Sequence, residues 1–213
     1  MEIRSKKQLK FYIMADRIMN GLSAKPTIKE KILDFAVSRP PIMKYLKYVR
    51  ELSYWRHQTG IIAKLMTGWK YRRCNQLSVK LGCFISEDVF RYGLVVPHHG
   101  TLRVGNKNRV GRYAVIHTLV NMTASQVEAG DGLYLSVGCK VIGPLSLGNN
   151  ITVAANSVVH KSVDGDNLLL AGMPASVKRE NYGAWYIRDG IRFQENVQKV
   201  ENLRVKMGLP EDI

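Results

Sequence analysis

The sequence predicts a parallel β-helix with α-helical segments at both ends, and three observations lead to this fold class. Aliphatic residues recur every six positions through much of residues 82–180, with turn-forming residues between them. The 213-residue chain is 46% hydrophobic, which is enough for one sizeable core. Residues 5–80 and the tail from 184 to 208 instead space their apolar residues at helical intervals of three and four. We therefore expect a mainly β protein with a helical N-terminal region (1–81), a β-helix (82–180) and a C-terminal helical tail (181–213).

The N-terminal region carries helix signals in order. Thr27 and Glu30 have the spacing of a capping box, so a helix is expected to begin after Thr27. Pro40 and Pro41 suit the first turn of another helix, and a third is expected over roughly 59–80. In the tail, Gly190 weakens the helical pattern. The apolar face of the helix after Pro41 is formed by Ile42, Tyr45, Leu46, Val49, Leu52 and Trp55.

The six-residue period predicts the β-helix. In this architecture short strands wind around an axis, and equivalent positions stack from coil to coil. The alternative, a run of ordinary short strands, does not account for two phased series of this length. The series are Val104, Val110, Ile116 and Met122, and then Leu135, Val141, Leu147, Val153 and Val159.

The period breaks at a pair of histidines in the stretch VVPHHGTLRVG. Phe84, Phe90 and Val96 keep the six-residue step, but the next aliphatic residue, Val104, follows eight positions later. Two inserted residues push side chains out of the regular wall, so we expect His98 and His99 to project from it. Three hexapeptides further on, His117 returns to the same edge of the coil.

The charge and the cysteines limit the class of protein. The net charge of +15 fits an anionic partner, but no recognised nucleic-acid-binding motif accompanies it, so nucleic acid is not expected. Three cysteines without paired spacing indicate a reduced chain, and no apolar leader opens the sequence. We expect a cytoplasmic protein in which much of the basic charge is solvated and membrane association is optional.

Four segments resemble the left-handed β-helix acyltransferases of the hexapeptide-repeat type. They are GLVVPHHGTLRVG, AVIHTLVNMT, GLYLSVGCKVIGPLSLGNNITVAANSVVHKSV and LLLAGMPASVKR. The resemblance is to the serine acetyltransferase group and its relatives in capsule and exopolysaccharide biosynthesis. It implies an enzyme with acetyl-CoA as donor, a hydroxyl acceptor and a homotrimer, or a multiple of three, with active sites between neighbouring coils.

The resemblance places the catalytic histidine on His98. A histidine that titrates near neutrality suits removal of a hydroxyl proton. Asp88, or alternatively Glu87, is a candidate to orient His98, and His117 either lines the site or fills the stack. We expect His99 to point away from the site, and His57 and His160 to lie on the surface. No metal ligand is assigned.

The resemblance also suggests residues for coenzyme A. The pantetheine arm is expected beside backbone groups of Ser136, Ala154 and Ala155. Lys161, Lys178 and Arg179 are candidates for the phosphates, with solvated surface positions as their alternative.

Departures from the serine acetyltransferase pattern favour another acceptor. Pro97 stands where those enzymes carry an aspartate, Cys83–Ser86 replace their Asp-Ile-His-Pro, and their Arg-His loop is cut down to NMTASQVEAGDG. A sugar or polysaccharide precursor is therefore the favoured acceptor, with serine, as in cysteine biosynthesis, as the alternative.

Two other classes stay open at this point. One is a β-helix zinc enzyme of the carbonic-anhydrase type with His98, His99 and His117 as ligands, although adjacent strand residues point to opposite faces. The other is a non-catalytic scaffold whose basic helices dock on a membrane or a glycosyltransferase complex.

Overall fold

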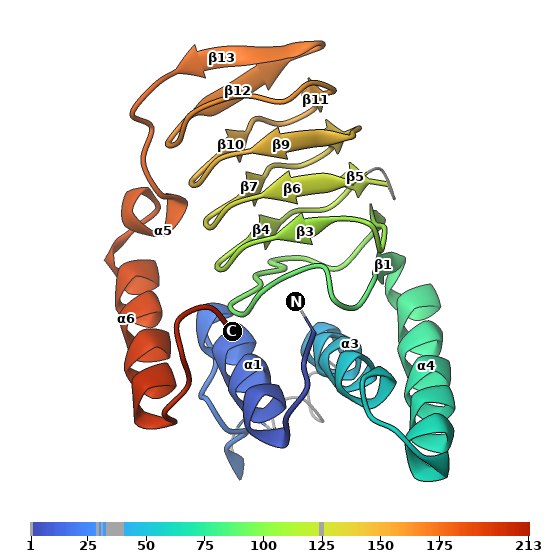
Figure 1. The fold of residues 1–213 in the computed structure, drawn as a ribbon. Helices are drawn as coiled ribbons and strands as arrows, with labels where there is room; N and C mark the ends of the chain where they lie inside the picture. Colours follow the sequence, from blue (N-terminus) through green and yellow to red (C-terminus); the bar gives the residue numbers. More distant parts are fainter. Residues whose placement is uncertain (1, 29, 31, 33–40, 124–125) are drawn as a thin grey trace.

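The computed structural model describes residues 2–28, 30, 32, 41–123 and 126–213, and it shows a stack of β-coils standing on a layer of helices (Figure 1). No helix within these ranges is both long and apolar enough to cross a membrane. The helices are α1 (Lys6–Met19), α3 (Ile42–Arg56), α4 (Ile61–Leu81), α5 (Trp185–Arg188) and α6 (Ile191–Lys206).

The coils have three faces, each formed by a sheet whose strands pair in parallel apart from the last. Sheet A contains β1 (Cys83–Ile85), β2 (Leu102–Val104), β5 (Asn121–Met122), β8 (Lys140–Val141) and β11 (Val158–Val159). Sheet B contains β3 (Arg109–Val110), β6 (Val127–Ala129) and β9 (Leu145–Leu147). Sheet C contains β4 (Val115–Ile116), β7 (Tyr134–Leu135), β10 (Thr152–Val153), β12 (Leu169–Gly172) and the antiparallel β13 (Ala175–Arg179).

The predicted six-residue series forms the core of the coils. All nine aliphatic residues of the two long series are buried, and they belong to one cluster that runs through the stack. Parallel pairing in register, such as Val104 with Met122, places them one above another. The β-helix prediction is confirmed.

Phe84 is the exception in the first coil. Its side chain is 44% exposed, whereas Cys83 and Ile85 on either side are buried. Ile85 pairs with Val104, so the inward step from Ile85 to Phe90 is five residues and not six. The predicted inward position of Phe84 is therefore wrong by one residue, which in a strand reverses the side-chain direction.

Within the described residues, the helices predicted after Pro41, over roughly 59–80 and in the tail are present, and helices pack against the first coil. α3 and α4 pack with the core of the coils, whereas α1 and α6 share a second cluster with Tyr92, Val95 and Trp185. Thr27 and Glu30 exchange the hydrogen bonds of a capping box, although most of the segment that follows lies outside the described residues. Gly190 separates α5 from α6.

Candidate functional site

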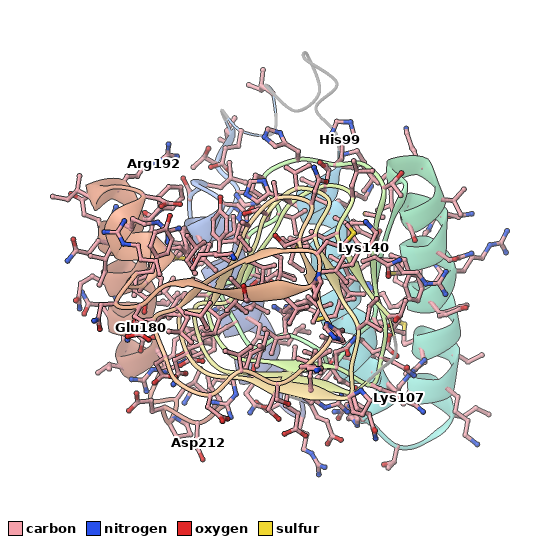
Figure 2. All side chains as sticks on the ribbon, turned by 90° about the horizontal axis from the view of Figure 1, so that it is seen from above. His99, Lys107, Lys140, Glu180, Arg192 and Asp212 are labelled. Atoms are coloured by element: carbon pink, nitrogen blue, oxygen red, sulfur yellow. The ribbon has the colours of Figure 1, made fainter. Side chains whose placement is uncertain are left out.

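One corner of the triangular coils collects most of the predicted site residues. At this corner sheet C passes into sheet A, and we call it the histidine edge. It consists of residues 97–101, 117–119, 136–138 and 154–156, from the lowest coil upward. Backbone hydrogen bonds fix the stacking: Leu119 N–H donates to Thr101 O, Gly138 N–H to Thr118 O, and Asn156 N–H to Val137 O. Viewed along the axis, His99 lies at one corner and Lys107 at the next, with Lys140 on sheet A between them (Figure 2).

The inserted loop projects the two adjacent histidines to the surface, as the break in the period predicts. Pro97, His98 and His99 are all exposed, while Val96 before them is buried. Gly100 has a φ of 143°, in the region that favours glycine, and it returns the chain to sheet A. The insertion therefore gives His98 an accessible imidazole at the lowest level of the histidine edge.

Polar groups of α1 hold the chain that leads into this loop. Asn20 accepts a hydrogen bond from Val96 N–H at 3.2 Å and donates to Leu94 O at 2.8 Å. Asp16 accepts from the N–H groups of Gly93 and Leu94, both at 2.9 Å. The end of α1 therefore fixes the position from which the histidine loop starts.

A buried ion pair joins this anchor to α3. Arg50 binds both carboxylate oxygens of Asp16, at 2.8 and 3.1 Å, and donates to the carbonyls of Phe90 and Arg91. With both partners buried, the charges are compensated by one another and by backbone groups. Sequence reasoning missed this anchor. The only indication of it in the sequence is Asp16, an acidic residue on the apolar face of the first helix.

His117 lies one coil above His98 and is held by a tyrosine. Its Nε2 is 2.8 Å from the Tyr134 hydroxyl. Burial lowers the pKa of His117, the charge of His98 lowers it further, and the Asp189 carboxylate opposes the shift. His98 is therefore close enough to His117 to influence its protonation, and His117 is held toward its neutral form.

The C-terminal segment adds a charged pair to this cluster that sequence reasoning also missed. Arg188 forms an ion pair with Asp189 at 2.8 Å and donates to Thr152 Oγ1 at 3.1 Å. The Arg188 guanidinium also lies over the Tyr134 ring, 5.7 Å from its centre. Since α5 is about fifty residues from Tyr134 in sequence, no local pattern could have predicted this contact.

A cavity of about 630 Å³ opens beside the histidine loop. Val96, Pro97, His98 and His99 form one wall, and residues of α1 and the start of α3 form another. Its charged lining residues are Lys44, which is exposed, and the Arg17–Glu30 ion pair with a separation of 2.5 Å. The cavity can therefore hold a small polar molecule within reach of an exposed imidazole.

The acidic residues considered as partners of His98 are engaged elsewhere. Asp88 bonds Ser53 at 2.5 Å and His57 at 2.8 Å, so the structure does not bring it to His98. Glu87 forms an ion pair with Arg56. His57 is thus half-buried between α3 and the first coil rather than a plain surface residue, whereas His160 is exposed.

The predicted coenzyme A residues divide between two parts of the coils. Ser136, Ala154 and Ala155 lie on the upper histidine edge, where the N–H groups of Ser136 and Ala154 donate to the coil above. Lys161 follows β11 and therefore lies across sheet A from them. Lys178 and Arg179 are exposed on β13, and the Arg179 guanidinium is 5.5 Å from the centre of the Tyr182 ring.

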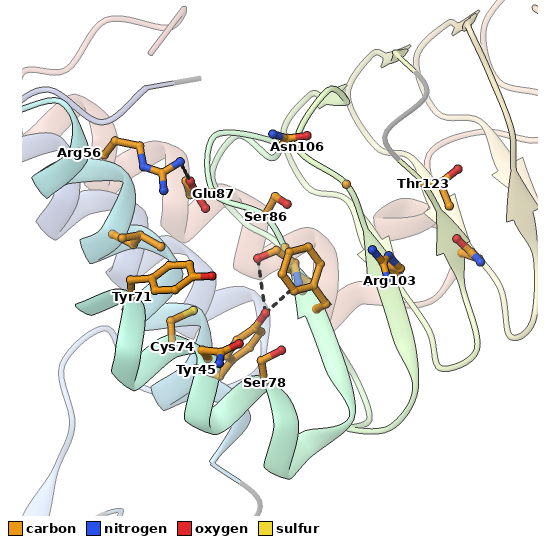
Figure 3. Close-up of a pocket in the computed structure, with 16 residues that line it drawn as sticks. Tyr45, Arg56, Tyr71, Cys74, Ser78, Ser86, Glu87, Arg103, Asn106 and Thr123 are labelled. Carbon is orange, nitrogen blue, oxygen red and sulfur yellow. Dashed lines mark hydrogen bonds and ion pairs between the residues drawn. The ribbon is translucent and has the colours of Figure 1, made fainter. Parts of the chain in front are cut away.

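A second cavity, of about 600 Å³, lies between α4 and the opposite corner of sheet A (Figure 3). Arg103, with its guanidinium 5.7 Å from the centre of the Phe84 ring, and the Arg56–Glu87 pair line it. Tyr45 joins its floor by accepting a hydrogen bond from Ile85 N–H at 2.7 Å. Since no histidine lines this cavity, it lacks the base that the first cavity has.

The part of the chain that the structure describes contains no set of side chains arranged to bind a metal ion. No group of three His, Cys, Asp or Glu side chains within it is placed to hold a metal ion. All three cysteines are free and buried, and burial raises the pKa of Cys83 to about 11. The thiol at Cys83 therefore stays protonated near neutral pH.

The coils and the flanking helices define the fold: the chain is a left-handed parallel β-helix with helices at both ends, as in solved serine acetyltransferases. Among solved structures, the serine acetyltransferase of Neisseria gonorrhoeae matches with a TM-score of 0.63 and 18% identity, over 87% of this chain and 72% of that one. The serine acetyltransferase of Brucella abortus strain S19 matches with a TM-score of 0.56 and 20% identity, over 82% and 67%.

Sequence comparison gives a second set of relatives, which match over a shorter part of the chain. The bifunctional protein GlmU of Psychrobacter sp. is 26% identical over 83 residues, which is 39% of this chain and 18% of that protein. GlmU of Bifidobacterium longum subsp. infantis is 27% identical over 109 residues, 47% of this chain and 24% of that protein. The chain thus spans about a fifth of the curated relatives that it matches, and no family model matches it.

Proposed function

We propose that this protein is an acetyl-CoA-dependent O-acetyltransferase with His98 as general base. The observation that carries the proposal is an exposed His98 beside a cavity, at the foot of the edge that also presents His117, Ser136 and Ala155. The fold shared with serine acetyltransferases supports it.

His98 acts on the acceptor hydroxyl. The imidazole accepts the hydroxyl proton as the acceptor oxygen forms its bond to the thioester carbonyl carbon. The carbon–sulfur bond then breaks, and the imidazolium returns the proton to the departing thiolate. Because burial lowers the pKa of His117, this second imidazole is held toward its neutral form beside the site.

The histidine edge fits the pantetheine arm of the donor. Leu119 and Val137 occur at successive coils of this edge and are 57% and 41% exposed. Exposed apolar side chains on neighbouring coils favour contact with the largely aliphatic arm. Of the three backbone positions assigned to this arm, Ala155 is exposed and thus accessible to it. Beside the top strands of sheet C, the guanidinium groups of Arg179 and Arg188 both lie over the Tyr182 ring. Their positive charges suit the phosphate groups of coenzyme A.

Serine is the first candidate acceptor. The fold neighbours are serine acetyltransferases, and the Neisseria gonorrhoeae enzyme is also known in complex with serine, with a TM-score of 0.59 to this chain. The exposed ammonium of Lys44 in the cavity beside His98 suits a carboxylate. These points favour serine over the sugar that the sequence departures favour.

A sugar hydroxyl is the second candidate, and a specific observation supports it. Pro97 and the buried, protonated Cys83 provide no carboxylate for an amino group. Glu30 is already engaged by Arg17 and by two backbone N–H groups. A neutral hydroxylated acceptor would not need a free carboxylate in this cavity.

Release of coenzyme A from acetyl-CoA tests the function and the acceptor together. Purified protein is incubated with acetyl-CoA and with serine or a panel of neutral and acidic sugars. We expect release that depends on one acceptor class and is lost in His98→Ala. If no acceptor stimulates release, or if His98→Ala is as active as the unmodified protein, the proposal is wrong.

A further inference from the structure

The outer face of α4 is apolar at its start and basic along the rest of its length. Ile61, Ile62, Leu65 and Trp69 are 76%, 68%, 70% and 46% exposed. Their spacing of one, four and eight residues places them on one face of the helix. The opposite face carries the buried residues Ala63, Cys74 and Leu81. Four large side chains are thus presented to solvent along about two turns.

The charge of α4 has one sign. Its sequence contains Lys64, Lys70, Arg72, Arg73 and Lys80, which are five basic residues, and no aspartate or glutamate. Lys70 is buried and paired with Glu51 at 2.7 Å. The other four are exposed, and no ion pair is seen for them among the described residues. The outer face therefore combines an apolar patch with uncompensated positive charge.

The position of α4 leaves this face accessible. In both views α4 is the outermost element on its side of the molecule, with α3 and the second cavity on its inner side (Figures 1 and 2). With 21 residues the helix is about 30 Å long. A flat surface can therefore reach the helix along its length without first meeting the coils.

We propose that α4 binds the surface of an anionic lipid bilayer through Ile61, Ile62, Leu65 and Trp69, with its basic residues against the headgroups. Interfacial helices combine an apolar face with lysine and arginine in this way. Each basic residue near an anionic bilayer adds to the attraction, which salt weakens. Pairing with α4 of a second copy would instead bring two basic helices together in a chain of net charge +15.

Trp69 provides a local probe for the experiment. The full chain is mixed with vesicles of phosphatidylcholine alone or of phosphatidylcholine with phosphatidylglycerol, and binding is measured by sedimentation and by tryptophan emission. We expect binding to the anionic vesicles only, weakened by salt, with emission moving to shorter wavelength. In Trp69→Phe the shift should vanish while the vesicles still retain the protein, because Trp185 is buried and Trp55 is partly buried against the second cluster.

Matched surface variants distinguish binding through α4 from nonspecific binding of exposed apolar side chains. The double variant Ile62→Ser/Leu65→Ser should bind anionic vesicles about tenfold more weakly or worse, with unchanged thermal unfolding. Ile191→Ser/Val205→Ser on α6, at side chains 74% and 67% exposed, should bind as the unmodified protein does. Absence of binding, equal binding to neutral vesicles, or self-association that the α4 variant abolishes would each overturn the proposal.

Discussion

His98 and His99 are adjacent and both exposed, yet we expect only one of them to take part in catalysis. His98 lies at a bend of the inserted loop, and its charge lowers the pKa of His117 one coil above. His98→Ala should lower turnover by about two to four orders of magnitude without loss of stability or acetyl-CoA binding, since the loop is exposed. Steady-state kinetics and binding measurements check this.

His99→Ala is the matched control for that prediction. It removes the same ring from the same loop and should cost far less activity. If His99→Ala is inactive while His98→Ala is active, the assignment is wrong by one residue. Equal, mild losses would direct the search for the base to His117.

His117 should make stability depend on pH. Its pKa is below 6.5 in the folded chain because of burial, so the unfolded chain binds a proton more readily. Stability from this group is therefore complete at higher pH, and it is lost as pH falls below 6.5 toward the lowered pKa. Relative to the unmodified protein, His117→Gln should gain stability between pH 7.5 and 5.5, measured by urea unfolding. A constant difference across this range would contradict the buried, tyrosine-bonded state.

At the scale of elements, the corners between sheets B and C depend on glycine for close stacking. A Cβ atom on Gly130 would lie 2.4 Å from Asn149 Oδ1 and 3.0 Å from Asn149 N. That side chain accepts a hydrogen bond from Asp131 N–H at 2.9 Å, as Asp131 accepts from Arg112 N–H one coil below. Each corner thus bonds to the next through one asparagine or aspartate, at a distance that leaves no room for a methyl group.

Gly130→Ala should therefore destabilise the coils by about 2 kcal/mol. Gly68→Ala is the control, because Gly68 lies inside α4 with nothing within 4 Å of an added Cβ. It should stabilise the protein by up to about 1 kcal/mol through helix propensity alone. Urea midpoints of the two variants should move in opposite directions. A neutral Gly130→Ala would mean that the coils can separate at this corner.

The sequence predicts the elements better than it predicts their contacts. Inward residues such as Val104 and Leu135 repeat because every coil packs an aliphatic side chain at the same place in its interior. Their period is therefore visible in the sequence. Phe84 was misplaced because the corner after Ile85 is one residue shorter than the repeat. A period that is counted from aliphatic residues alone does not reveal that one turn is a residue shorter than the others.

The candidate site was predictable only where it interrupts the repeat. The insertion at Pro97–Gly100 marks His98 by its effect on spacing, and stacking in steps of eighteen or nineteen residues brings His117 above it. Asp189 and the Asp16–Arg50 anchor depend on how separate helices pack against the coils, whereas Tyr134 reaches His117 from the next coil. Such contacts follow from the tertiary fold and leave no local signature.

For the whole molecule, we expect the histidine edge of one chain to form one wall of a groove that a second copy completes. His98, Leu119 and Val137 all face solvent along this edge. A heterologous contact between this edge and another side of a second copy forms a ring if its rotation closes, and the resemblance to hexapeptide-repeat acyltransferases implies three copies. We therefore expect a mass of three chains, or a multiple of three, by light scattering at micromolar concentration.

A charge placed on this edge should disrupt both the assembly and the reaction. Leu119→Asp/Val137→Asp should yield monomers with little acetyl transfer, because a carboxylate cannot be buried without a partner. Val205→Asp, at an apolar residue of α6 that is 67% exposed, should keep both the mass and the activity. Light scattering and coenzyme A release on the same samples provide the comparison. If the unmodified chain is a monomer and fully active, a single chain forms the complete site and the second wall is unnecessary.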